Sequence, residues 1–174
     1  YREAGISVVE DISEAEILFG VKEVPIAQLI PNKTYFFFSH TIKEQAYNRS
    51  ILQTVLKKNI RLIDYEVLKD EEGKRVVAFG RWAGIVGAYN ALWTYGKKTD
   101  LYELSRARQL EDLREMHQEL RKVQLPPIKI VVTGSGRVGG GVKEVLDFLG
   151  LREVNTHDFL HCYFEEPVYV VLGS

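Results

Sequence analysis

The sequence predicts an α/β protein made of two incomplete domains with parallel sheets, joined by long bridging helices. In the first half, strand-like runs at 35–38 and 60–63 flank a helical pattern at 46–56. In the second half, an apolar run at 128–133 leads through a glycine-rich turn into another amphipathic helix. Strands linked through such helices are usually parallel, with right-handed crossovers. The two halves therefore share one kind of architecture.

Composition excludes several classes of partner. The 174 residues are 45% apolar and 27% charged, which is typical of a folded globular protein. Twenty-three basic and 24 acidic side chains leave no net field to attract nucleic acid or an anionic membrane. The single cysteine, Cys162, cannot form an internal disulfide and fits a reducing compartment. With no apolar run near the roughly 20 residues of a membrane span and no signal peptide, we expect a cytoplasmic protein. We also expect this chain to be part of a longer one.

The first domain is expected to cover residues 1–82. Several short β-branched or apolar runs read as strands: Ile6–Val9, Glu16–Val21, Tyr35–Phe38, Ile60–Ile63 and Arg75–Phe79. Thr41, followed three residues later by Glu44, predicts a capping box at the start of the helix between the third and fourth runs.

Residues 83–125 are expected to form the bridging helices. The apolar spacing predicts one helix over Ala83–Tyr95 and a second over Leu101–Val123. Two prolines at 126–127 then mark the start of the third region, residues 126–174. In that region, Glu153–Asn155 and Val168–Leu172 are expected to be further strands.

A glycine motif follows the strand-like run at 128–133. It reads G-x-G-x-x-G and consists of Gly134, Ser135, Gly136, Arg137, Val138 and Gly139. Between a strand and a helix, such a turn lets the backbone approach a pyrophosphate at the helix N-terminus. The motif therefore predicts a Rossmann-like domain that binds NAD or NADP, and the alternative is a glycine turn with packing duties alone.

The position of the expected ribose-binding acid is less defined. An acidic residue should lie about 20 positions after the glycine turn, at the end of the next strand. Asp158 is the best candidate by distance, but Asn155 stands where an acid often does, so NAD and NADP are not distinguished. Arg137 either contacts phosphate or lies solvated on the first helical turn.

Polar side chains follow the strands of the first domain. Lys22 comes after the run ending at Val21, and His40 comes after the run ending at Phe38. Because the carboxyl ends of parallel strands meet at one edge of a sheet, we expect the two groups to converge there and move protons. The next strand delivers Glu66 to the same edge. The alternative is a capping histidine and a solvated lysine.

No metal site is predicted. His157 and His161 have the i,i+4 spacing of a helical metal pair, but no third ligand stands near them in the sequence.

Five motifs together resemble a known family. They are GVKEVP (20–25), FFFSHTIKEQ (36–45), RLIDYE (61–66), GKRVVAFGRWAG (73–84) and TGSGRVGGG (133–141). In this order they resemble saccharopine dehydrogenases of the lysine-forming type and the related lysine-ketoglutarate reductase domain. More thinly, they resemble alanine dehydrogenase and the nicotinamide-binding transhydrogenase subunit. The resemblance covers nearly the whole chain.

The resemblance implies an oxidoreductase that interconverts saccharopine with lysine and 2-oxoglutarate, using NAD or NADP. It implies that Lys22 and His40 are the acid/base pair, that Glu66 modulates them and that Arg75 meets a substrate carboxylate. An alanine dehydrogenase-like enzyme and a catalytically silent dinucleotide-binding domain stay open as alternatives. Small-molecule substrates are the expected partners, and a homo-oligomer is an open option.

Overall fold

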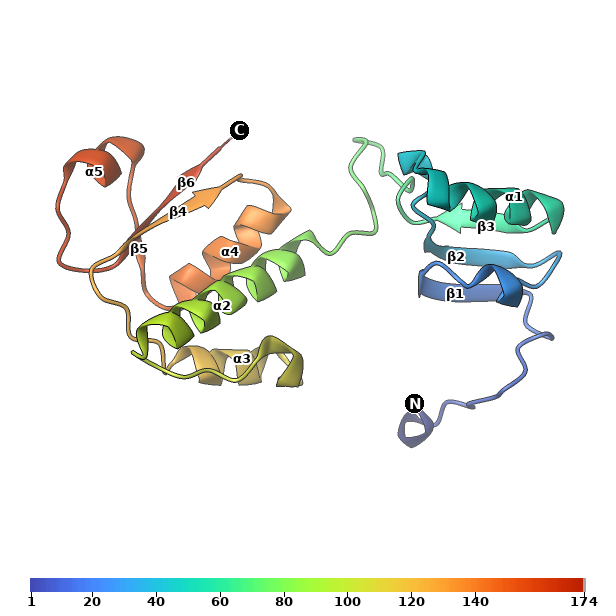
Figure 1. Cartoon of the computed structure of the whole chain (residues 1–174), viewed down its shortest axis with the longest axis horizontal. Coiled ribbons are helices and arrows are strands. Elements are labelled where there is room, and N and C mark those ends of the chain that lie inside the picture. Colours follow the sequence, from blue (N-terminus) through green and yellow to red (C-terminus); the bar gives the residue numbers. More distant parts are fainter. Residues whose placement is uncertain (174) are drawn as a thin grey trace. The chain divides into compact units, whose positions relative to one another are not determined.

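The computed structural model describes residues 1–173, which form two compact units, residues 1–78 and 79–173. Each unit contains a three-stranded, wholly parallel sheet flanked by helices (Figure 1). The predicted α/β, Rossmann-like fold class is therefore confirmed. The two units are described separately below.

The first unit holds β1 (Ile17–Lys22), β2 (Thr34–Phe38) and β3 (Arg61–Asp64) in the order β1-β2-β3, with α1 (Arg49–Lys57) between β2 and β3. Alternate residues of β2 point to opposite faces of the sheet, as in any strand. The face toward α1 forms the core of the unit, made of Leu29, Tyr35, Phe37, Ile51, Val55 and Ile60. Strand β2 pairs with both β1 and β3 and is therefore the central strand of the sheet.

The other face of this sheet carries an aromatic row. The ring of Phe36 stacks on Phe19 with centroids 4.6 Å apart, and the ring of Phe38 meets Tyr65 at 5.1 Å. Of the three consecutive phenylalanines, only Phe37 therefore points toward α1.

Three predictions about the first unit are wrong. Ile6–Val9 forms no strand among the described residues, and its side chains are exposed. Arg75–Phe79 contributes only an isolated antiparallel bridge, between Lys69 and Arg75. The predicted capping box is a single 3-10 turn, Thr41–Lys43, after which Glu44 turns to φ 53°. A hydrophobic run becomes a strand only if another strand lies beside it, which propensity alone does not determine.

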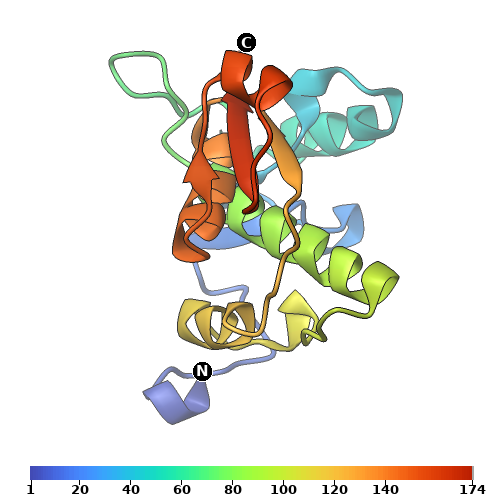
Figure 2. The ribbon, with the colours of Figure 1, turned by 90° about the vertical axis from the view of Figure 1, so that its left-hand side faces the viewer.

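The second unit holds α2 (Gly80–Thr99), α3 (Leu113–Leu120), β4 (Lys129–Thr133), α4 (Arg137–Phe148), β5 (Arg152–Glu153), α5 (Thr156–His161) and β6 (Val168–Leu172). Its sheet order is β4-β6-β5, so the last strand lies between the other two (Figure 2). Single 3-10 turns occur along the described chain at Arg2–Ala4, Ile26–Gln28, Thr41–Lys43, Ala46–Asn48 and Ala107–Gln109.

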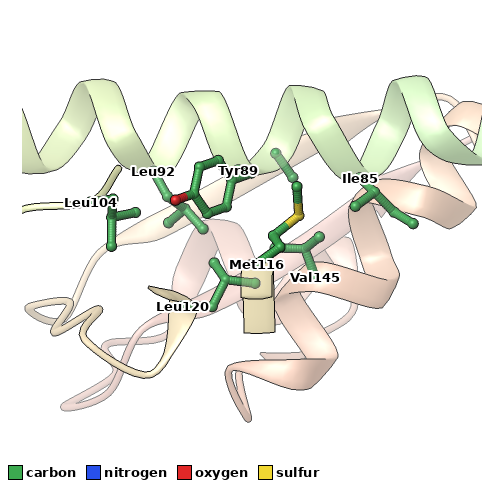
Figure 3. Close-up of a cluster of buried hydrophobic side chains, with 8 residues drawn as sticks. Ile85, Tyr89, Leu92, Leu104, Met116, Leu120 and Val145 are labelled. Carbon is green, nitrogen blue, oxygen red and sulfur yellow. The ribbon is translucent and has the colours of Figure 1, made fainter. Parts of the chain in front are cut away.

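The helices α2, α3 and α4 share one core (Figure 3). Tyr89 and Leu92 of α2 pack with Met116 and Leu120 of α3 and Val145 of α4. The structure thus groups the two helices that were expected to bridge the domains with the second unit.

The second of those helices is shorter than predicted. Only Leu113–Leu120 of the expected Leu101–Val123 is α-helical, because the Asp112 side chain caps a helix start by accepting the Glu115 N–H at 2.8 Å. The first is longer than predicted, and it runs from Gly80 to Thr99.

Helix α2 also packs against α4 through glycines. A Cβ on Gly84 would lie 2.0 Å from the Val138 carbonyl oxygen, and a Cβ on Gly141 would lie 2.1 Å from the Arg81 carbonyl oxygen. The two backbones therefore cross in direct contact, which leaves no room for a side chain at either position.

Tyr169 of β6 ties α4 to the sheet. Its buried hydroxyl donates to Asp147 Oδ1 at 2.5 Å and accepts from Lys143 Nζ at 2.6 Å. Lys143 also donates to Glu153 at 2.7 Å, so a single lysine joins α4, β5 and β6.

We expect Tyr169→Phe to lower the free energy of unfolding by about 1–3 kcal/mol, because it removes two hydrogen bonds between a buried hydroxyl and charged side chains. Urea denaturation followed by tryptophan fluorescence measures this in the 174-residue chain, since both tryptophans, Trp82 and Trp93, lie in the second unit. Tyr163→Phe is the control, because that ring is exposed. Equal stability of the two variants would contradict the prediction.

Candidate active site

Three strands of the first unit end at one edge of the sheet. Lys22, the last residue of β1, lies opposite Phe38 of β2, and Phe37 lies opposite Asp64, the last residue of β3. His40 follows β2 by two residues, and Glu66 follows β3 by two residues. The polar groups predicted at this edge therefore come from neighbouring strand ends.

The structure brings His40 and Glu66 into contact. Nδ1 of His40 lies 3.0 Å from Oε2 of Glu66, and the side chains are 23% and 7% exposed. The backbone of His40 has φ 58°, in the left-handed region. The ring is therefore held by a buried carboxylate on one side and is partly open to solvent.

Lys43 is a further member of the cluster that the sequence reasoning missed. Its Nζ lies 3.1 Å from Nδ1 of His40 and 3.5 Å from Oε1 of Glu66. Residues three apart in a 3-10 turn stack above one another, and Thr41–Lys43 is such a turn, so Lys43 lies beside His40. The spacing of three was visible in the sequence, but the 3-10 turn was not.

The two contacts at Nδ1 of His40 exclude one another. A lysine ammonium only donates, so Lys43 can donate to Nδ1 only when that nitrogen carries no proton, whereas Glu66 accepts from Nδ1 only when it does. The partner of Nδ1 therefore selects the tautomer of the ring and the protonation of Nε2.

Arg75 meets the same carboxylate. Its Nη2 lies 3.4 Å from Oε1 of Glu66, and its side chain is 42% exposed. Glu66 thus faces three basic side chains, those of His40, Lys43 and Arg75.

The charge state of Glu66 follows from these neighbours. Burial alone raises the pKa of Glu66, but the hydrogen bond and charge of His40, together with Lys43, outweigh burial and leave the pKa below its usual value. Glu66 is therefore a carboxylate at neutral pH.

A glutamate whose pKa is lower in the folded state stabilises the protein above its unfolded pKa of about 4.3. This stabilisation disappears as the pH falls through the folded pKa. We expect Glu66→Gln to be less stable than the parent chain at pH 7, with the difference shrinking below about pH 4. Urea titrations followed by circular dichroism at both pH values measure it. Glu71→Gln, on the exposed turn, is the matched control, and a difference independent of pH would contradict the assignment.

A β-bulge sets the direction of Lys22. From Phe19 to Lys22 the chain advances three residues, while the facing strand advances two, from Phe36 to Phe38. Residues paired across a sheet share a face, and one extra residue turns the following side chain over. Lys22 therefore lies on the face of Phe36 and Phe38, away from α1.

The glycine turn of the second unit has the geometry that the motif requires. Gly134 adopts φ 90°, and a Cβ on Gly139 would lie 1.9 Å from the Gly134 carbonyl oxygen. A Cβ on Gly136 would meet nothing within 4 Å. Gly136 is also the N-cap of α4 and provides no side-chain cap for its N–H groups. The turn thus leaves open space beside a helix N-terminus, which suits a diphosphate.

The other residues of the turn are exposed: Ser135, Arg137 and Val138.

The structure does not bring Asp158 to this turn. Asp158 lies in the first turn of α5, where its N–H donates to the Asn155 side chain at 2.8 Å. The end of α5 is bound by Lys129, the first residue of β4, through the carbonyl oxygens of Phe159 and Cys162. The glycine turn follows the opposite end of β4, and β6 separates β4 from β5. No ribose-binding acid is therefore assigned.

The two histidines of α5 lie near each other, with ring centroids 4.8 Å apart. Over residues 1–173, no group of three or more histidine, cysteine or acidic side chains is placed to hold a metal ion.

The parallel sheets and the glycine turn define a Rossmann-like α/β protein. Residues 1–86 match the family described as alanine dehydrogenase/PNT, N-terminal domain. A solved L-alanine dehydrogenase has a similar fold, with a TM-score of 0.54 and 14% sequence identity, over 97% of this chain and 47% of that chain. Within residues 1–173, no helix has the length and apolar character needed to cross a membrane.

Sequence comparison is more specific. The chain is 38% identical over 176 residues to the mitochondrial alpha-aminoadipic semialdehyde synthase of Bos taurus, over 91% of this chain and 19% of that protein. It is 30% identical over 172 residues to the saccharopine dehydrogenase [NAD(+), L-lysine-forming] of Candida glabrata, over 89% of this chain and 46% of that protein. The chain is thus a homologue of these proteins and spans less than half of their length. The resemblance predicted from its motifs is confirmed.

Proposed function

We propose that the full-length protein containing this chain interconverts saccharopine with lysine and 2-oxoglutarate by hydride transfer to or from a nicotinamide cofactor. The observation that carries the proposal is the cluster of His40, Glu66 and Lys43 at the strand-end edge that also presents Lys22. The homologues with lysine-forming saccharopine dehydrogenase names support the choice of reaction.

The proposed reaction requires several proton transfers. In the saccharopine-forming direction, the side-chain amine of lysine adds to the ketone of 2-oxoglutarate, so that a nitrogen–carbon bond forms and a proton must leave nitrogen. Water then leaves, which requires a proton on the departing hydroxyl, and gives an imine. A bound nicotinamide would supply the hydride for the imine carbon, and the imine nitrogen takes up a proton to give the amine. The protein must therefore supply a base, an acid and carboxylate binding.

His40 and Lys22 are the proposed proton-transfer groups. When Nδ1 of His40 donates to Glu66, Nε2 carries no proton and can take one from the substrate amine. Once Nε2 has gained a proton, the imidazolium is stabilised by the Glu66 carboxylate 3.0 Å away. Lys22, as an ammonium, can give a proton to the departing hydroxyl.

Lys43 and Arg75 are the proposed carboxylate-binding groups. Their side chains are 48% and 42% exposed, and both are cationic and close to His40 or Glu66. The guanidinium of Arg75 presents donors in a planar fork that matches a carboxylate. Because 2-oxoglutarate and saccharopine carry several carboxylates, two basic side chains beside the proton-transfer groups suit them.

The glycine turn is the proposed binding site for the cofactor diphosphate. The backbone at Gly134, Gly136 and Gly139 provides the close approach, and Arg137 stands on the first turn of the helix. No residue of this chain is assigned to discriminate between NAD and NADP.

Assays of the full-length protein test the proposal. We expect oxidation of reduced nicotinamide only when lysine and 2-oxoglutarate are both present.

The match to the alanine dehydrogenase N-terminal family favours a second candidate, an enzyme that reductively aminates a smaller oxo acid. Turnover with ammonia and pyruvate but not with lysine would establish that candidate. Nucleotide binding without turnover on any pair would indicate a catalytically silent domain.

A further inference from the structure

The Asp64 carboxylate links both partners of the His40–Glu66 pair. Its side chain lies at the end of β3 and the residue is 7% exposed. Oδ2 accepts from the Ser39 hydroxyl at 2.5 Å, and Oδ1 accepts from the Ser39 N–H at 3.4 Å and from the Glu66 N–H at 2.9 Å. One buried group is therefore bonded to the residue before His40 and to Glu66 itself.

His40 needs such support because its backbone is in a disfavoured conformation. At φ 58°, a residue with a Cβ is held in the left-handed region only when its surroundings fix it. On one side, the Ser39 hydroxyl oxygen accepts the Thr41 N–H at 3.1 Å. On the other, the buried Asn48 side chain donates to the His40 carbonyl oxygen at 3.0 Å.

We infer that Asp64 is a positioning residue for the proton-transfer pair. By bonding Ser39 and Glu66 together, Asp64 joins the ends of β2 and β3 and fixes the 3.0 Å approach of His40 Nδ1 to Glu66 Oε2. None of these bonds reaches the His40 ring or the Glu66 carboxylate, so Asp64 acts through Ser39 and through the backbone of Glu66. This inference rests on the proposed role of His40.

Two variants at this position separate positioning from charge. Asp64→Ala removes all three bonds. Asp64→Asn retains an oxygen for the Ser39 and Glu66 N–H groups, and its amide N–H can donate to the Ser39 hydroxyl oxygen. If Asp64 acts by position, the asparagine recovers most of the turnover that alanine loses.

The experiment measures kcat of the full-length protein in two backgrounds, one with His40 and one with His40→Ala. With His40 present, we expect Asp64→Ala to lower kcat at least about tenfold, since misplaced acid/base groups lose their catalytic help. In the His40→Ala background we expect less than about a twofold further loss, because residues that act as a unit are not additive. A similar loss in both backgrounds, or an asparagine variant as impaired as alanine, overturns the inference.

Controls keep the outcomes distinct. Asp70→Ala is the matched substitution, because Asp70 also accepts two backbone N–H groups, those of Glu72 and Lys74, at an exposed turn. It should leave kcat unchanged. If Asp64→Ala does not fold, Ser39→Ala, which removes the hydroxyl that donates to Asp64, takes its place in the same two backgrounds, and a similar loss in both overturns the inference. If His40→Ala itself has parental turnover, the proposed function fails at His40. If His40→Ala is impaired and Asp64→Ala is not, only the inference on Asp64 fails.

Discussion

Replacing His40 by alanine is expected to lower kcat of the full-length protein by about 10²–10⁴-fold, the usual contribution of a positioned acid or base. His40 has the geometry for this role, because Glu66 holds its Nδ1 at 3.0 Å and the ring remains 23% exposed. Steady-state kinetics with lysine and 2-oxoglutarate measure the loss, and circular dichroism checks that the variant is folded.

Lys22→Met tests the other half of the pair. Methionine keeps the length of the side chain and removes its charge and protons, so a loss of at least about tenfold in kcat is expected. The matched control is Lys33→Met, which lies before β2, at the opposite end of the sheet. For the histidine, the control is His157→Ala, an exposed ring in the second unit. Parental rates in both His40→Ala and Lys22→Met would mean that the cluster is not the catalytic site.

Gly136→Val is expected to weaken nicotinamide dinucleotide binding at least about tenfold, or roughly 1.4 kcal/mol. The backbone around Gly136 borders open space, and a branched side chain there would occupy the volume that a diphosphate needs. Isothermal titration calorimetry with NADH and with NADPH measures the affinity of the variant and of the parent for each nucleotide. The parent's two affinities also show which cofactor it prefers.

The control is Gly140→Ala, four residues further into the same glycine run. A Cβ at Gly140 also meets nothing within 4 Å, and alanine favours the helix there. The Gly140→Ala protein should bind the nucleotide as the parent does. Unchanged affinity in Gly136→Val would leave the turn with packing duties only.

The sequence predicted the central parts of the fold because local patterns determine them. The runs at 35–38 and 60–63 became β2 and β3, and the glycine motif became the turn between β4 and α4. Prediction from the sequence failed where the pairing of strands determines the fold. Ile6–Val9 has strand composition but no neighbouring strand among the described residues, and the insertion of β6 between β4 and β5 is invisible to any local pattern.

The candidate site was likewise predicted only in part. The rule that parallel strands end at one edge predicted that Glu66 would share an edge with Lys22 and His40, and the structure brings His40 and Glu66 into contact there. Lys43 was missed because the 41–44 stretch was interpreted as the first turn of an α-helix, which would direct Lys43 differently from the 3-10 turn that forms. Asp158 was chosen by counting residues, and the shortness of β5, only Arg152–Glu153, moved it onto a helix instead.

The bulge before Lys22 means that chain length matters here as much as residue type. Gly20 allows the irregularity, since a Cβ there would come within 3.3 Å of the Lys22 carbonyl oxygen. If the strand paired regularly with Val21 still present, Lys22 would lie three residues beyond Phe19, and its ammonium would point toward the α1 side of the sheet. A related protein that is one residue shorter between Phe19 and Lys22 would need no bulge, because its lysine would follow Phe19 by two residues and lie on the Phe36 side of a regular strand.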